Sequence, residues 1–149
     1  MRAVVQRVKS ASVKVSGESI SEISRGLLIF HGVAHNDTSA DVTYLANKIA
    51  HLRIFEDSSG RMNRSLLDIS GEGLVVSQFT LYGDCRKGRR PSFVNAAHPE
   101  KAQALYQEFI EALSNTGVLI QAGIFKEMMD IQLVNDGPVT ILVDTTKLF

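Results

Sequence analysis

A Gly-Pro step near the C-terminal end of the chain interrupts an otherwise strand-like stretch. Gly137 and Pro138 lie between two apolar runs, residues 129–134 and residues 139–143. Proline has no N–H for a sheet ladder and fixes its own φ, while glycine adopts backbone angles closed to other residues. The pair therefore predicts a rigid step. It can be a hairpin turn, for which Asn-Asp-Gly is ordinary chemistry, or a bend whose carbonyl groups serve another purpose.

The size and composition of the chain favour a single domain, residues 1–149. Of these 149 residues 44% are hydrophobic, which is enough to form a core without disulfides or a structural metal. Apolar runs such as residues 26–30 are too short to cross a membrane, and the first residues lack a signal-peptide pattern. We therefore expect a cytoplasmic protein with no membrane contact.

Hydrophobic periodicity predicts a β-rich chain with two helices. Alternating apolar residues indicate a hairpin over residues 2–23, and continuous apolar runs indicate buried strands at residues 26–33 and 74–81. Apolar positions three and four apart predict one helix after the caps at residues 37–39 and a second helix that Pro99 starts. Shorter strands are expected at residues 52–55, 118–125, 129–134 and 139–144.

This order of elements excludes a doubly wound nucleotide-binding sheet, and the chain has no G-x-G-x-x-G or Walker-type loop. We predict an α/β, β-rich fold in which two packed mixed sheets carry two helices on one outer face, giving β/β/α layers. The apolar surplus would also suit a subunit interface.

No conventional catalytic or metal centre is evident. The chain has a single cysteine, Cys85, and its four histidines form no H-x-H or H-E-x-x-H pattern, so we expect no metal and no cofactor. Structural or solvated roles are the ordinary interpretation of these histidines. No G-x-S-x-G elbow surrounds Ser77, which argues against an α/β-hydrolase triad. The four histidines to which this interpretation applies are His31, His35, His51 and His98.

One strand carries polar residues where a core strand would continue with apolar ones. Ser77, Gln78 and Thr80 follow the apolar start of this strand. Buried polar groups must be satisfied or face a cavity. The strand is therefore either leaving the core with one wet face, or it forms the wall of a pocket. In the second case the backbone N–H groups of Phe79 and Thr80 are available to a developing oxyanion.

A basic run follows directly, with four cations within five residues, at Arg86, Lys87, Arg89 and Arg90. The formal net charge of the chain is zero, so any nucleic-acid contact must depend on such a local patch. A solvated loop is the common interpretation of this pattern, and phosphate contact with RNA is the functional one. Its position after the polar strand suggests a substrate that carries phosphates.

Two segments resemble paired motifs of a known family. Residues 77–81 are similar to the S-Q-x-T motif of the D-aminoacyl-tRNA deacylases, and residues 135–140 are similar to their N-x-G-P-x-T motif. Residues 6–8, 11–13 and 90–93 extend the resemblance along the chain. The family consists of homodimeric α/β proteins that hydrolyse the ester joining a D-amino acid to the 3′ end of tRNA. The resemblance implies a proofreading hydrolase whose partner is the aminoacyl-tRNA 3′ end and whose active sites lie at the subunit interface.

The resemblance also implies roles for individual residues. Gly137-Pro138 would be the cis Gly-Pro motif that enters the partner subunit's active site and rejects L-amino acids, while glycine, with no side chain to exclude, would be accepted. Arg7 would hold the Gly-Pro loop through its backbone oxygens. Phe125 and Met129 would line the pocket for the terminal adenine, although core packing is an equally good interpretation of both. The basic run would contact tRNA.

The mechanism follows less directly from the motifs. Ser77, Gln78, Phe79 and Thr80 would form the catalytic group, but no histidine or lysine in the motif activates the Thr80 hydroxyl. We expect the ribose 2′-OH of the substrate to assist attack by water. Two other functions stay open at this point: a non-catalytic RNA-binding module, and a small-metabolite ester hydrolase on the same fold.

Overall fold

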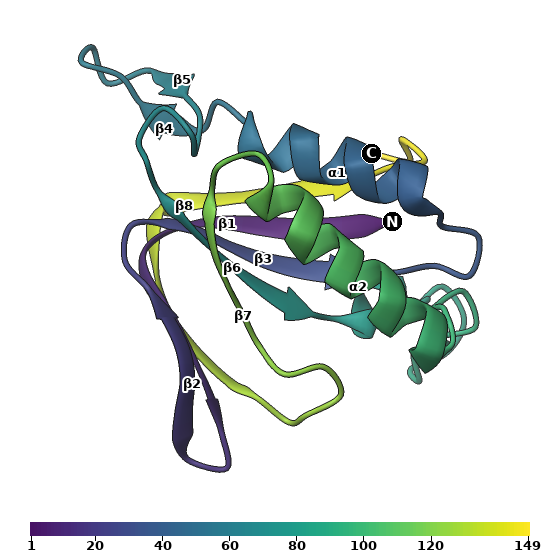
Figure 1. Cartoon of the computed structure of the whole chain (residues 1–149). Helices are drawn as coiled ribbons and strands as arrows, with labels where there is room; N and C mark the ends of the chain where they lie inside the picture. The colour runs from purple at the N-terminus through teal and green to yellow at the C-terminus, as the bar shows by residue number, and fades with distance from the viewer.

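The computed structural model describes the whole chain, residues 1–149, as a curved mixed sheet with two helices on one face (Figure 1). Six strands form the main sheet in the order β2-β1-β3-β6-β7, with β8 paired to β1. They are β1 (Arg2–Val15), β2 (Glu18–Ile23), β3 (Gly26–Gly32), β6 (Glu72–Ser77), β7 (Leu119–Ala122) and β8 (Asp130–Asp144). The other elements are α1 (Ser39–Ala50), α2 (Pro99–Ser114), the 3₁₀ helix η1 (Phe79–Tyr82), and a two-stranded ribbon of β4 (Phe55–Glu56) and β5 (Met62–Arg64).

Strand β1 is the longest partner in the sheet. The antiparallel strand β8 runs along one edge of β1 from Arg2, opposite Asp144, to Lys14, opposite Asp130. On its other edge β1 pairs first with β3 and then with β2. Strands β3, β6 and β7 are parallel to one another.

Two hydrophobic clusters lie on opposite faces of this sheet. Leu27, Ile29 and Val75 belong to the cluster beneath α1 and α2. Their neighbours Leu28 and Val76 belong to a second cluster, which the outer half of β1 and strand β2 help to form. Because the sheet curves until β2 lies against β6 and β7, strands β3 and β6 are buried on both faces. This explains why their sequences are continuously apolar.

The predicted fold class is confirmed. The chain is β-rich, and both helices pack on one face of the β layers. The two β layers prove to be parts of one continuous six-stranded sheet, and the only separate sheet is the small β4-β5 ribbon. Neither helix is long and apolar enough to span a membrane.

Both predicted helix starts are confirmed. Thr38 precedes α1, and the Asp41 carboxylate accepts a hydrogen bond from the Thr38 backbone N–H at 2.9 Å. Pro99 is the first residue of α2, where a missing N–H costs nothing. On the predicted apolar faces, Leu45 and Phe109 are fully buried.

Several predicted strand limits were wrong. The strand expected over residues 74–81 ends at Ser77 and turns into η1. Strand β4 begins only at Phe55, and β7 covers four of the eight residues expected at 118–125. The apolar start of β6 predicted a longer strand. The strand ends at Ser77, because the polar residues from there on lie outside the core that covers both faces of β6.

The hairpin interpretation of the Gly-Pro step was also wrong. Strand β8 passes through it without reversing, and the Gly137–Pro138 peptide bond is cis. Gln6 of β1 pairs with Thr140, while Val8 pairs with Asn135. Residues 136–139 therefore leave the ladder as a bulge opposite Arg7, which we call the Gly-Pro bulge.

The tight pairing of β3 with β6 predicts an unequal response to two added methyl groups. A Cβ at Gly26 would lie 1.8 Å from the Glu72 backbone oxygen, whereas a Cβ at Gly73 would meet the flexible end of Ile120 at 2.6 Å. We expect Gly26→Ala to lower the free energy of unfolding by about 3 kcal/mol and Gly73→Ala by about 1 kcal/mol. Urea unfolding measures both, and equal losses would contradict the assigned strand pairing.

Candidate functional site

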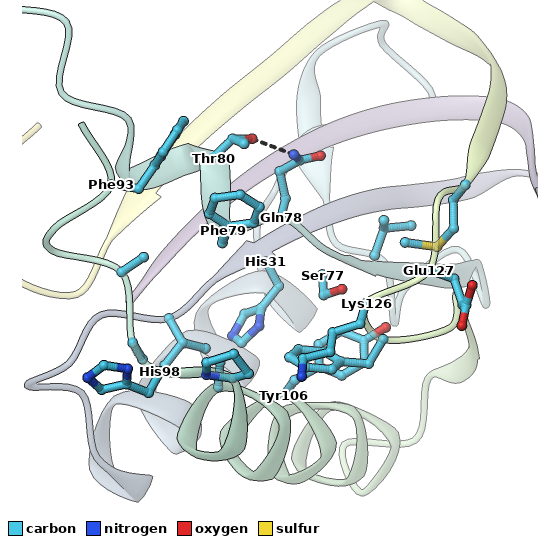
Figure 2. Close-up of a pocket in the computed structure, with 18 of the residues that line it drawn as sticks. His31, Ser77, Gln78, Phe79, Thr80, Phe93, His98, Tyr106, Lys126 and Glu127 are labelled. Atoms are coloured by element: carbon cyan, nitrogen blue, oxygen red, sulfur yellow. Dashed lines mark hydrogen bonds between the residues drawn. The ribbon is translucent and has the colours of Figure 1, made fainter. Parts of the chain in front are cut away.

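A cavity of about 1250 Å³ opens where β6 ends. Strand β6, η1, the N-terminal half of α2 and the segment before β8 form its walls (Figure 2). Six of the residues predicted for the site line it: Ser77, Gln78, Phe79, Thr80, Phe125 and Met129. The fold thus brings the S-Q-x-T motif and the two predicted adenine-pocket residues together.

The chain changes from strand to 3₁₀ helix at the edge of this cavity. Gln78 still donates its backbone N–H to the His31 carbonyl oxygen at 2.8 Å, and Leu81 then donates to the Gln78 carbonyl oxygen at 3.2 Å. Phe79 and Thr80 are the first two residues of η1. Backbone N–H groups at the start of a helix have no partner within it, so they are available to an anionic oxygen.

The Thr80 hydroxyl has an amide rather than a base as its partner. Gln78 Nε2 donates a hydrogen bond to Thr80 Oγ1, as the dashed line in Figure 2 shows. A carboxamide cannot take up the proton that a nucleophilic hydroxyl must lose. The pair can orient an ester, but it does not activate threonine.

Aromatic side chains form the walls of the cavity. Phe79 packs edge-on against Phe93, with ring centroids 5.0 Å apart and planes at 69°. Across the cavity Tyr106 of α2 lies 5.8 Å from Phe125 and donates its hydroxyl to the Val75 carbonyl oxygen at 2.9 Å. Burial raises the pKa of Tyr106 well above its usual value. Sequence reasoning missed Tyr106, although its position beside Leu105 on the apolar face of α2 was a signal.

Sequence reasoning also missed His31. This side chain is 1% exposed, stacks on Phe109 and lines the cavity floor. His35 and His98 line the same cavity. No group of three or more histidine, cysteine or acidic side chains lies close enough together to hold a metal ion.

The segment before β8 forms one rim. Met129 lies so close to Gly123 that a Cβ there would be 2.6 Å from its sulfur, so glycine makes room for the thioether. Lys126 adopts a left-handed φ of 69°, and Met128 is 90% exposed. Phe125 therefore has three bulky neighbours at the mouth of the cavity, Lys126, Glu127 and Met128.

Arg7 is buried and bonded to the Gly-Pro bulge. Its Nε donates to the Asp136 carbonyl oxygen at 2.8 Å, and its Nη1 donates to the Ile54 carbonyl oxygen at 2.6 Å. The Asn135 side-chain oxygen accepts the Val139 N–H at 2.8 Å and closes the bulge from within. The conformation of the bulge is thus fixed by a planar guanidinium on one side and an amide on the other.

The Gly-Pro bulge does not reach the cavity of its own chain. Gly137 and Pro138 are not among the cavity residues, and β8 is separated from β6 by β1 and β3. Three strand spacings amount to roughly 14 Å. The two predicted parts of the site therefore lie apart within one chain.

The basic run lies beside the cavity without lining it. Its loop is closed by two backbone hydrogen bonds between Asp84 and Ser92, at 2.8 and 3.0 Å. Arg86 donates to the Asp84 carboxylate, which lowers the pKa of Asp84 to about 2. The remaining exposed cations, Lys87, Arg89 and Arg90, have no acidic partner and stay available to a phosphate backbone.

Comparisons of sequence place this chain among known proteins. Residues 4–144 match the family model described as D-Tyr-tRNA(Tyr) deacylase. A D-aminoacyl-tRNA deacylase of Desulfatibacillum aliphaticivorans is 61% identical over 97% of this chain and 99% of the relative. The protein of the same name from Halothermothrix orenii is 56% identical over the full length of both chains.

Solved structures are similar over nearly the whole chain. A protein described as c-Myc DNA Unwinding Element Binding Protein superposes with a TM-score of 0.93 at 43% identity, covering 97% of this chain and 99% of that one. A probable eukaryotic D-amino acid tRNA deacylase superposes with a TM-score of 0.85 at 17% identity, covering 95% and 97%. The second likeness supports the fold alone.

The contacts of Arg7 predict that lysine cannot replace it. Arg7→Lys keeps the charge but loses the fork that reaches both Asp136 and Ile54, so we expect the free energy of unfolding to fall by about 2 kcal/mol. Arg53→Lys is the matched control, because the exposed Arg53 donates only to the Asn63 carbonyl oxygen. Its expected change in urea unfolding is below about 0.5 kcal/mol. Similar losses in both variants would show that the Arg7 contacts add no stability.

Proposed function

The chain belongs to the D-Tyr-tRNA(Tyr) deacylase family, and we propose on that basis that it hydrolyses D-aminoacyl-tRNA to free D-amino acid and tRNA. The observation that carries this proposal is the position of its S-Q-x-T motif, which turns into η1 at the wall of the 1250 Å³ cavity. The enzyme is thus a carboxylic ester hydrolase of the cytoplasm, and it removes the amino acid from tRNA that carries the wrong one. Residues 1–149 act as one domain, because both hydrophobic clusters share strands β1 and β3.

In the proposed reaction water attacks the ester carbonyl carbon, and the bond from that carbon to the ribose oxygen breaks. The N–H groups of Phe79 and Thr80 stabilise the oxyanion, while Ser77 and Gln78 position the ester. The neighbouring ribose 2′-OH of the substrate assists the attacking water. The engagement of the Thr80 hydroxyl by the Gln78 amide supports this choice over a threonine nucleophile.

Selection of the D-enantiomer is assigned to the Gly-Pro bulge of a second copy of the chain. Its carbonyl oxygens would crowd the space that an L side chain needs, and a rigid backbone obstacle rejects more sharply than an apolar pocket. Glycine has no side chain to crowd, so glycyl-tRNA would also be hydrolysed. The bonds from Arg7 and Asn135 support this role, since they hold the bulge in one conformation.

A homodimer is required for this arrangement, because the bulge and cavity of one chain lie apart. Strand β8 pairs only with β1, which leaves its outer edge free. Val134 and Leu142 expose apolar surface on β8, on either side of the bulge. These features support a subunit interface along β8, with the active sites at that interface.

The tRNA end is assigned to the cavity and to the basic run beside it. Phe125 and Met129 would contact the terminal adenine, and the phosphates would follow Lys87, Arg89 and Arg90, with Arg86 shared with Asp84. A second candidate function is nucleic-acid binding without chemistry. The exposed cations favour it, as does a relative of 43% identity whose name describes DNA binding.

The proposed activity predicts a stereochemical preference that one assay can measure. Purified protein is incubated with D-tyrosyl-tRNA and, separately, with L-tyrosyl-tRNA, and the released amino acid is followed. We expect the D-ester to be hydrolysed at least about a hundredfold faster, because an obstacle worth about 3 kcal/mol gives this ratio. Equal rates would exclude the chiral role of the bulge, and salt-sensitive binding without turnover would support the non-catalytic alternative.

The proposed mechanism predicts which hydroxyl matters. Thr80→Ala is expected to keep kcat within about threefold of wild type, because no base activates Thr80, whereas loss of a true nucleophile costs several orders of magnitude. A substrate that ends in 2′-deoxyadenosine is expected to react at least about a hundredfold more slowly. An unchanged rate on the deoxy substrate would count against 2′-OH assistance, and inactivity of Thr80→Ala would restore threonine as nucleophile.

A further inference from the structure

The floor of the cavity holds a polar side chain that the proposed mechanism does not use. His31 is 1% exposed, and neither of its ring nitrogens has a hydrogen-bond partner in the protein. An unpaired buried polar group has lost its hydrogen bonds to water without replacement, so such groups are rare in folded proteins. Because His31 lines a cavity, its missing partner can be a group that enters that cavity.

The His31 ring is fixed in position by its neighbours. It stacks on Phe109 with centroids 4.3 Å apart and planes at 11°, and it lies 6.0 Å from the Tyr106 ring. Phe109 is itself fully buried. A ring held on this aromatic support presents its nitrogens in a constant direction, as a positioning group must.

Ser77 lies next to His31 across the sheet. The two residues are paired in register between the parallel strands β3 and β6. Ile29 and Val75, two residues earlier on each strand, both face the helices, so His31 and Ser77 share that face. Both line the cavity, and Figure 2 shows them close together between η1 and α2.

The charge state of His31 limits what it can do. Burial, and to a smaller extent the ammonium group of Met1, lowers the pKa of His31 to about 3. The ring is therefore neutral near pH 7 and offers one donor and one acceptor. It is unsuited to take up a proton during catalysis, since its protonated form is disfavoured.

We propose that His31 is a positioning residue whose ring holds a hydroxyl group against Ser77 at the cavity floor. This hydroxyl both donates and accepts, and it belongs either to a trapped water molecule or to a ribose of the substrate. The ribose source rests on the proposed function. The polar subsite itself depends only on the unpaired ring and the cavity beside it.

Two variants of His31 test this subsite. His31→Leu removes both ring nitrogens at similar volume, whereas His31→Gln keeps a donor and an acceptor. We expect kcat/KM for D-tyrosyl-tRNA to fall about tenfold in His31→Leu and to return to within about threefold of wild type in His31→Gln. If the ring has no partner in the substrate-free protein, the Tm of His31→Leu should equal or exceed that of wild type, because an unpaired polar group is removed. His51→Leu, at an exposed histidine outside the cavity, is the control.

A merely structural role would give the opposite pattern. The apolar His31→Leu would then keep wild-type kcat and KM, and His31→Gln would lose stability and activity together. Either of these results would overturn the proposal.

The same variants distinguish the two sources of the hydroxyl. If a trapped water is held, kcat falls in His31→Leu with KM unchanged, and a crystal structure of the wild type shows a water about 3 Å from a ring nitrogen. If a ribose hydroxyl is held, KM rises and the calorimetric Kd for adenosine increases about tenfold.

Should the wild type not hydrolyse D-tyrosyl-tRNA, the proposed function fails, while the crystal structure and the adenosine titration still decide the subsite. Finding neither the water nor weaker adenosine binding would overturn it.

Discussion

The pairing of β1 along both of its edges is the constraint on which the rest of the structure depends. One edge pairs with β8 from Arg2 to Lys14, interrupted at the Gly-Pro bulge, and the other edge pairs with β3 and then with β2. Val5, near the start of β1, belongs to the cluster beneath the helices, while Val13, near its end, belongs to the second cluster. Arg7 lies where β8 leaves the ladder, so its side chain is free to bond the backbone of the Gly-Pro bulge. Both cores and the fixed bulge therefore derive from one strand.

Features encoded by neighbouring residues could be predicted from the sequence. The spacing of Leu45 and Ile49 identifies α1, and Pro99 marks the start of α2, because caps and periodicity act within a few residues. The polar break after Val76 left two interpretations open, a strand with one wet face or the wall of a pocket, and in the structure Ser77 to Thr80 line the cavity. These inferences needed no knowledge of distant contacts.

Features that depend on distant contacts could not be predicted. The continuity of β8 through Gly137-Pro138 depends on β1, more than a hundred residues away, whereas local turn chemistry favoured a hairpin. The importance of His31 depends on Phe109 and on the cavity, and nothing in its own strand shows that its ring lacks a partner. The roles of Gly137, Pro138, Phe125 and Met129 in selection and binding came from family resemblance, and they are proposals for this chain.

The separation of the Gly-Pro bulge from the cavity has a consequence for how fidelity would depend on protein concentration. A lone chain has the S-Q-x-T wall and the aromatic cavity, but its bulge lies across two intervening strands. In the proposed dimer, discrimination between mirror-image substrates is therefore a property of the assembled pair. When the protein is diluted below the dissociation constant of the dimer, the cavity of one chain would lose the Gly-Pro bulge of the other. The discrimination between D- and L-substrates would therefore depend on protein concentration as well as on the sequence.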